Sequence, residues 1–497
     1  MPFLSDLAFE TGLAARSLAD YARGGGLRLG VTGLSRAGKT IFVTALVHDL
    51  LRLAAPSHES DRNPFPVLRV KAEGRLVRAS LDPQPDDAVA RFLYEDHLAA
   101  LTGGAGGPQE RRWPQSTSRI SELRLTLEFE RAAGWRKGPA SLTLDIVDYP
   151  GEWLLDLPLL GKNYAQWSRE TLEASGSAAR APLAAPWRGF LAAIDPNKAA
   201  SEETARRAAE LFTAYLRACR EDPHGLSTLP PGRFLMPGDL EGSPALTFAP
   251  LTLSEGDRPA AGSLAAMMER RYEAYRRHVV RPFFRDHFAR LDRQIVLVDA
   301  LAALNAGPAA MRDLETAMVD VLAAFRVGRS SLLSSVLRPR IDRVLFAATK
   351  ADHLHHTSHD RLEAILRHLA GRAIARVEGV GAKVDVVALA AVRATREAAV
   401  KHGRETLDAV VGTPLADETL DGETFDGFGE AAIFPGELPK DPAAVFLGGA
   451  PAALDSAYRF LRFRPPILAA APDGALGPFP HIRLDRALQF LLGDRLA

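Results

Sequence analysis

The chain has 497 residues, of which 47% are hydrophobic and 25% charged, which is typical of a folded globular protein and excludes a disordered or collagen-like chain. Lys and Arg total 61, as do Asp and Glu, so the net charge is zero, which argues against nucleic acid as a partner. The single cysteine, Cys219, excludes an internal disulfide and a cysteine-cluster metal site.

Hydrophobic periodicity predicts strands and helices that alternate along much of the chain. The expected strands lie at 27–32, 122–130, 141–147, 294–299, 343–348 and 383–389. The expected helices lie at 7–23, 41–53, 87–101, 203–220, 264–290, 309–325, 359–374 and 484–492. Alternating strands and helices favour an α/β fold with a mostly parallel sheet covered on both faces. Residues 54–117 otherwise read as irregular, and 153–293 as a large α-helical insertion.

A phosphate-binding motif follows the first predicted strand. The segment Gly33-Leu-Ser-Arg-Ala-Gly-Lys-Thr40 matches G-x-x-x-x-G-K-[ST] between a strand and a helix, which is the context that this motif requires. Lys39 is expected to bridge the β- and γ-phosphates, and the Thr40 hydroxyl to ligate Mg²⁺. The predicted phosphate-binding residues are Gly33, Ser35, Arg36, Ala37, Gly38, Lys39, Thr40 and Ile41. Three interpretations of Arg36 stay open: contact with phosphate, pairing with Glu152, or a place at the pocket rim.

Two further motifs follow predicted strands. Asp148-Tyr-Pro-Gly151 places an acid where it can hold Mg²⁺ through water, and Gly151 can offer its N–H to a γ-phosphate. Thr349-Lys-Ala-Asp352 is the [NT]-K-x-D pattern, in which the aspartate accepts from guanine N1–H and the 2-amino group while the lysine stem lies along the base. Adenine lacks both donors, so the motif favours GTP over ATP.

These three motifs, in this order, resemble those of Ras-like GTPases of the translation-factor-related class. More narrowly, GLSRAGKT, DYPGEW and TKAD, separated by a helical insertion, resemble the YcjX-like family of bacterial stress-associated P-loop proteins over almost the whole chain. The resemblance implies a Ras-like P-loop domain that binds GTP and GDP with Mg²⁺ and hydrolyses GTP. It also implies a cytoplasmic location and a nucleotide-dependent switch in a stress response.

The resemblance also implies further site residues. Thr117, just before a predicted strand, is expected to be the switch threonine, with Ser116 and Ser118 as competitors, and the expected metal ligands are Thr40, Thr117 and Asp148. Ala391 and Val392 are expected to back the base. The expected catalytic residues are Lys39, Glu152 and Thr117. Glu152 stands where many Ras-like enzymes carry glutamine; because a carboxylate repels the γ-phosphate, we expect slow intrinsic turnover.

The patterns divide the chain into six expected parts. These are an N-terminal helix and linker (1–26), the first half of the P-loop GTPase domain (27–152), the helical insertion (153–293), the second half (294–395), an irregular extension with small strands (396–480) and a C-terminal helix (481–497). The insertion follows the phosphate-sensing turn, so we expect it to report the nucleotide state to an unknown protein effector.

Several alternatives stay open. A P-loop ATPase, or a nucleotide-binding scaffold with negligible hydrolysis, would use the same phosphate loop. Peripheral membrane contact also stays open, whereas no apolar run is long enough to span a bilayer and no signal peptide is expected. His353, His355 and His356 follow Asp352 in a polar segment, and the sequence alone does not favour a metal site there.

Overall fold

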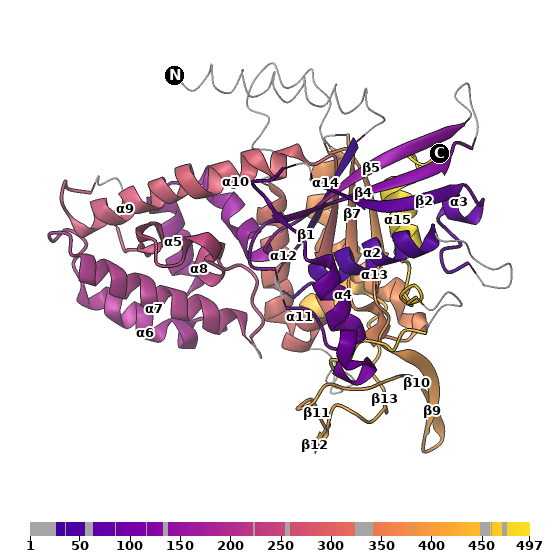
Figure 1. Ribbon diagram of the computed structural model, residues 1–497. Coiled ribbons are helices and arrows are strands. Elements are labelled where there is room, and N and C mark those ends of the chain that lie inside the picture. Colours follow the sequence, from indigo (N-terminus) through magenta and orange to yellow (C-terminus); the bar gives the residue numbers. More distant parts are fainter. Residues whose placement is uncertain are drawn as a thin grey trace.

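The computed structural model has a central sheet with a group of helices beside it and a set of small strands at the bottom of the view (Figure 1). It describes residues 26–34, 36–54, 63–84, 86–115, 117–132, 138–221, 224–253, 259–323, 341–379, 381–447, 458, 460–469 and 475–497. The predicted helix over 7–23 lies outside these residues, as do Ser35 and Ser116. Within the described part of the chain, every helix is too short or too polar to cross a lipid bilayer.

The main sheet runs in the order β2-β4-β5-β1-β6-β7-β8, with the short strand β3 paired to β4. Strands β5, β1, β6, β7 and β8 are mutually parallel, while β2 and β5 each pair antiparallel with β4. The strands span Gly26–Gly33 (β1), Leu76–Asp82 (β2), Ala90–Arg91 (β3), Ser121–Glu130 (β4), Pro139–Asp148 (β5), Arg293–Val298 (β6), Arg343–Ala348 (β7) and Lys383–Ala388 (β8). This arrangement confirms the expected α/β fold with a mostly parallel sheet.

Helices cover both faces of this sheet, and the strand β6 shows why its last four residues, Ile295 to Val298, are all apolar. Successive side chains of a strand point to opposite faces. Ile295 and Leu297 therefore pack with α2 and α15, whereas Val296 and Val298 pack with α11, α12, α13 and α14. These helices span Lys39–Leu53 (α2), Ala300–Ala306 (α11), Pro308–Ala323 (α12), His359–Leu369 (α13), Gly371–Glu378 (α14) and Leu484–Leu492 (α15).

Three sequence predictions about local structure are wrong. The segment 54–117 is not merely irregular, because it contains α3 (Arg69–Ala72), β2 and β3. The helix expected at 87–101 begins only at Tyr94, as α4 (Tyr94–Thr102). The helix expected at 359–374 is divided into α13 and α14. The strand β2 has exposed and half-buried positions without a clean apolar face, which is why its pattern is weak.

The segment after Gly151 folds as a helical unit with an aromatic interior, drawn on the left of Figure 1. Its elements are the 3₁₀ segment Gly151–Gly161, α5 (Tyr164–Ala174), α6 (Ala181–Ala193), α7 (Glu202–Arg220), α8 (Gly232–Leu235), α9 (Leu264–Tyr275) and α10 (Arg281–Asp286). The sequence predicts a helical stretch over 264–290 in which Pro282 starts a new helix or causes a kink, and the structure has α9, a π-helical turn at Arg276–Val280 and then α10 there. Pro282 lies at the start of α10, where its missing N–H is tolerated.

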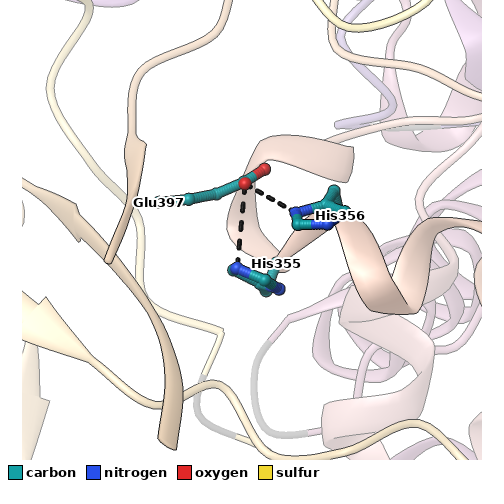
Figure 2. Close-up of side chains that lie close together, drawn as sticks. All are labelled: His355, His356 and Glu397. Atoms are coloured by element: carbon teal, nitrogen blue, oxygen red, sulfur yellow. Dashed lines mark hydrogen bonds and ion pairs between the residues drawn. The ribbon is translucent and has the colours of Figure 1, made fainter. Parts of the chain in front are cut away.

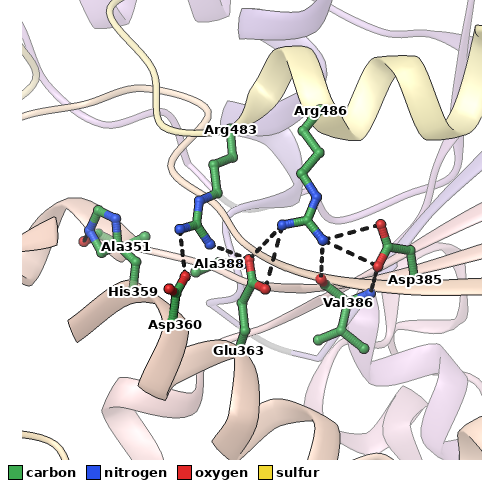
Figure 3. A network of polar contacts seen from close by, with 9 residues as sticks. All are labelled: Ala351, His359, Asp360, Glu363, Asp385, Val386, Ala388, Arg483 and Arg486. Atoms are coloured by element: carbon green, nitrogen blue, oxygen red, sulfur yellow. Dashed lines mark hydrogen bonds and ion pairs between the residues drawn. The ribbon is translucent and has the colours of Figure 1, made fainter. Parts of the chain in front are cut away.

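The C-terminal part of the chain forms small strands, and its last helix, α15, packs against the main sheet. The small strands β9 (Arg396–His402), β10 (Glu405–Gly412) and β13 (Ala431–Ile433) form one sheet, and β11 (Thr419–Leu420) pairs with β12 (Glu423–Thr424). At the start of α15, Arg483 bonds Asp360 and Glu363, and Arg486 bonds Glu363 and Asp385, as Figure 3 shows. This network fixes α15 to α13 and β8.

Candidate functional site

The phosphate-binding loop joins β1 to α2 in the middle of the sheet. Gly38 has a φ of 83°, in the left-handed region that favours glycine, and as the N-cap residue it has no side chain with which to cap the first turn of α2. The N–H groups of that turn therefore remain available to an anion, and the helix dipole favours negative charge there. A Cβ added at Gly33 would lie 2.6 Å from the Leu297 carbonyl oxygen, so this close approach also requires glycine.

Lys39 begins α2 and turns its amino group back toward the loop. Its Nζ donates to the carbonyl oxygens of Gly33 at 2.9 Å and Leu34 at 3.3 Å. Burial lowers the pKa of Lys39, while the carboxylates of Glu152 and Asp148 act in the opposite direction. The lysine is thus a buried cation that is held over the loop by two carbonyls.

Thr40, Thr117 and Asp148 form a chain of hydrogen bonds beside this lysine. The Thr40 and Thr117 hydroxyl oxygens are 3.0 Å apart, and Thr117 donates to Asp148 Oδ2 at 2.5 Å. Because Thr117 gives its proton to the carboxylate, Thr40 is the donor in the first bond. Burial raises the pKa of Asp148 to about 6, against the opposing effects of Lys39 and Thr117. The sequence predicted these three residues as metal ligands, and the fold brings all three together.

This oxygen cluster fits Mg²⁺. Among the described residues, Asp148 Oδ1 is buried and has no hydrogen-bond partner. A buried carboxylate oxygen without a partner carries a large desolvation cost, which a cation with its bound water would offset. Hydroxyl and carboxylate oxygens are also the ligand types that Mg²⁺ prefers.

Gly151 and Glu152 follow β5 and lie against the phosphate loop. A Cβ added at Gly151 would be 2.0 Å from the Gly33 carbonyl oxygen and 2.7 Å from Lys39 Nζ, so only glycine fits. Glu152 is 5% exposed, and its Oε1 lies 3.4 Å from Nη1 of Arg220, the last residue of α7. Arg220 was not predicted from the sequence, because no motif marks it.

The helical unit contacts this segment at further points. A Cβ added at Gly232 would lie 1.7 Å from the Glu152 carbonyl oxygen, and the Arg233 guanidinium stacks 3.1 Å from the centre of the Trp153 ring. Asp156 accepts from the Gly232 N–H at 2.8 Å and from the Tyr275 hydroxyl at 2.6 Å. Burial raises the pKa of Asp156 to about 6. The helices therefore hold the segment that directly follows the phosphate-sensing turn.

A cavity of about 90 Å³ lies between the loop and these helices. Its polar lining includes Arg36, Glu152, Arg220 and Asp299, and its remaining walls are mostly apolar. Arg36 has a φ of 63° and an exposed side chain at the rim of the loop. Arg36 and Glu152 line the same cavity, and Arg220 is an ion-pair partner of Glu152.

The expected base-reading loop lies at the same edge of the sheet, after β7. The Thr349 N–H donates to the Val298 carbonyl at 2.9 Å, and Lys350, with a φ of 61°, pairs with Asp299. Asp352 is 4% exposed, and its Oδ2 accepts from the Ala394 N–H at 2.9 Å. The loop is thereby held from both β6 and the segment after β8.

The remaining predicted binding residues occupy the same region. Ala391 and Val392 follow β8, and the Ala351 N–H of the TKAD loop donates to the Leu389 carbonyl at 3.2 Å. Ile41 packs its side chain with Val392 in a small apolar cluster, so only its backbone is available to phosphate. Ala37, within the loop, is buried.

A phosphate loop after the central strand, an acid at the end of the neighbouring parallel strand and a third loop at the same edge define a P-loop protein of Ras-like α/β fold. The chain belongs to the YcjX-like family, DUF463, whose family model matches residues 27–496. It is 36% identical over 483 residues to a protein of Escherichia coli (strain K12) named Ras-like GTPase YcjX, covering 95% of this chain and 96% of that protein. It is also 36% identical over 485 residues to the Ras-like GTPase YcjX of Shewanella oneidensis, covering 95% of this chain and 94% of that protein.

Proposed function

We propose that this protein binds GTP with Mg²⁺, hydrolyses it to GDP and phosphate, and acts as a nucleotide-dependent switch. The observation that carries the proposal is the hydrogen-bonded chain of Thr40, Thr117 and Asp148 beside the buried Lys39. The TKAD loop at the same sheet edge favours guanine over adenine. The name Ras-like GTPase, which both relatives carry, supports the same class.

The residues of the phosphate loop and of the segments beside it each have a proposed role in binding the nucleotide. The loop N–H groups and Lys39 hold the β- and γ-phosphates, and the Gly151 N–H contacts the γ-phosphate. Thr40 and Thr117 hold Mg²⁺, with Asp148 behind a bound water. An Mg²⁺ ion held by these residues would supply positive charge that stabilises the negative charge developing on the phosphate. The hydrogen bonds among Thr40, Thr117 and Asp148 keep these oxygens close together, which would reduce the entropic cost of ordering them around an ion.

Glu152 is proposed to position or activate the attacking water. A free carboxylate at this place would repel the γ-phosphate, since two negative charges a few ångströms apart interact unfavourably in a poorly solvated site. Arg220 lies 3.4 Å from Glu152 and offsets that charge. The helical unit would therefore contribute to phosphate binding through a residue that no GTPase motif contains.

Base recognition is proposed for Asp352 and Lys350. The Asp352 carboxylate would accept from the guanine N1–H and 2-amino groups, and Lys350, fixed by Asp299, would lay its stem along the base. Ala391 and Val392 would back the base through their main chain. Because α8 contacts Glu152 and Trp153, we also propose that the helical unit passes the nucleotide state to a protein effector. The stress role and cytoplasmic location remain part of this proposal.

Single-turnover phosphate release tests the proposed function. With excess protein over nucleotide, we expect Mg²⁺-dependent release from GTP and none from ATP. The intrinsic rate is expected to be slow, on the order of 10⁻⁴ to 10⁻² per second, as in switches that await an activator. Equal release from both nucleotides would indicate an ATPase, and tight GTP binding without any release would indicate a scaffold.

Replacing Arg220 with Ala is expected to weaken GTP binding by roughly three- to tenfold while GDP binding changes little, because Glu152 then meets the γ-phosphate without its cation. Titration of a fluorescent GTP analogue and its GDP counterpart measures the difference. The double variant Arg220→Ala with Glu152→Gln should regain the parental ratio, since the repelling charge is gone. Arg217→Ala, at an exposed position of the same helix, is the matched control. An equal loss for GTP and GDP would contradict this role.

A further inference from the structure

A cluster of histidine and carboxylate side chains lies between the segment after Asp352 and the β9–β10 hairpin. His355 and His356 come from the turn that precedes α13, Glu397 from β9 and Asp408 from β10. Figure 2 shows His355 and His356 both directed at the Glu397 carboxylate. None of these residues takes part in the nucleotide site described above.

The three labelled side chains offer ligand atoms close to a common point. Glu397 Oε2 is 2.7 Å from His356 Nδ1 and 3.7 Å from His355 Nε2. One ligand atom from each residue lies within 4.8 Å of the other two. Metal–ligand bonds of about 2.0–2.1 Å place the ligand atoms of a tetrahedral zinc ion roughly 3.3 Å apart. Small side-chain rotations would therefore bring all three onto one ion.

The second nitrogen of His355 is already oriented. Its Nδ1 lies 3.3 Å from Asp408 Oδ2 and 3.0 Å from Thr357 Oγ1, and Thr357 donates to the same carboxylate at 3.1 Å. A metal-binding histidine usually donates its other ring N–H to a carboxylate, which fixes its tautomer and leaves the remaining nitrogen free to bind the metal. His355 has this arrangement, with Nε2 facing Glu397.

The pairing of the hairpin explains why both carboxylates face the histidines. Asp408 is opposite Ala399, which is two residues after Glu397 on β9. Residues two apart on a strand share a face, so Glu397 and Asp408 project from the same side of the hairpin. The other Glu397 oxygen, Oε1, lies 3.4 Å from Arg393 Nη2, which leaves Oε2 for the histidines.

We propose that His355, His356 and Glu397 bind one divalent transition-metal ion, with Asp408 orienting His355 through its second ring nitrogen. Two imidazoles and one carboxylate favour Zn²⁺ over Mg²⁺, which prefers oxygen ligands alone. Three protein ligands leave room for water on the ion. The site is separate from the Mg²⁺ site proposed at Thr40, and its existence does not depend on the proposed GTPase function.

The ion would fasten the hairpin to the base-reading loop. The segment that leads into β9 already contacts that loop, because the Ala394 N–H and the Thr395 hydroxyl both bond to Asp352. The sequence did not favour a metal among neighbouring histidines, since Glu397 is 41 residues from His356 and only folding brings them together. His353, in contrast, is buried against the Phe463 ring and is not a ligand of this site.

Calorimetric titration of Zn²⁺ into the untagged full-length protein tests the site, after treatment with a chelator and in excess Mg²⁺. We expect one tightly held zinc ion per chain and a rise in melting temperature with zinc. His356→Ala and Glu397→Gln should abolish this binding, and Asp408→Asn should weaken it by roughly 10- to 100-fold. The His356 side chain is 64% exposed, so its removal should not disturb folding.

His278→Ala, which removes an exposed histidine on the far helical unit, is the matched control and should bind zinc as the parent does. Substitution with Co²⁺ gives a second readout, because visible absorption typical of four or five ligands should appear in the parent and disappear in His356→Ala. Absence of saturable zinc binding would overturn the proposal. It would also be overturned by equal binding in the parent, His356→Ala and Glu397→Gln, which would place the zinc elsewhere.

Discussion

Replacing Lys39 with Ala is expected to weaken GTP binding by roughly a hundredfold. The Lys39 amino group is the buried cation of the phosphate loop, and a charge-assisted contact of this kind with phosphate is worth about 2–4 kcal/mol. In a site closed to water this attraction is only weakly screened. Calorimetric titration of the parent and the variant with a non-hydrolysable GTP analogue in Mg²⁺ measures the loss.

The contacts of Lys39 also predict how its removal affects the stability of the protein. The Lys39 amino group donates to the Gly33 and Leu34 carbonyls, and its removal leaves these two acceptors without that donor. Since those carbonyls border the loop, water can replace the amino group, and we expect only a small change in melting temperature. Lys198→Ala, at an exposed position in the helical unit, controls for the loss of one positive charge. Unchanged nucleotide affinity in Lys39→Ala would refute phosphate binding by this loop.

Replacing Asp352 with Asn is expected to lower GTP affinity by roughly 10- to 100-fold and to shift preference toward xanthosine triphosphate. The amide would point a donor at the donors of guanine, and an unsatisfied buried polar group costs about 1–3 kcal/mol. Xanthine carries an oxygen acceptor in place of the 2-amino group, so it restores the pairing. Competition of GTP, xanthosine triphosphate and ATP against a fluorescent nucleotide gives all three affinities.

The same experiment separates base reading from a structural role. In the Asp352→Asn variant the side-chain amide oxygen can still accept from the Ala394 N–H, which lies 2.9 Å from Asp352 Oδ2 in the parent, so the loop should keep its shape. Asp96→Asn, at an exposed position of α4, is the control. Loss of affinity for all three nucleotides would show that Asp352 supports the loop without reading the base. Unchanged GTP affinity would refute its role altogether.

Much of the fold was predictable because its signals are local. The strands β1, β6 and β7 are short, mostly apolar runs buried on both faces, and the helix α15 was predicted with its observed bounds. The strand β2 was missed because an edge strand without a clean apolar face lacks the alternation on which such predictions rest. The interruption near Pro282 was predicted, but the π-helical turn before it was not, because a change from i→i−4 to i→i−5 hydrogen bonds has no clear local sequence signal.

The residues of the candidate functional site were likewise predictable where their signals are local. Each nucleotide motif is a short segment in which the backbone path requires the glycine and the ligand chemistry requires the lysine or aspartate, so Gly33, Lys39 and Asp148 could be named without a structure. The choice of Thr117 rested on its place before a strand, and the fold sets its hydroxyl 3.0 Å from Thr40. The roles of these residues stay predictions until the variants are measured.

The sequence by itself determined the class of fold, the phosphate loop and the order of the motifs. These features depend on residues that are close together in the chain, as strand periodicity and loop geometry do. Only the tertiary structure decided that Arg220 pairs with Glu152 and that Glu397 meets His355 and His356. These partners are 68 residues apart in the first case and 41 residues apart for His356 and Glu397 in the second. No spacing rule links such distant positions, since their contact depends on how separate helices and strands pack against one another.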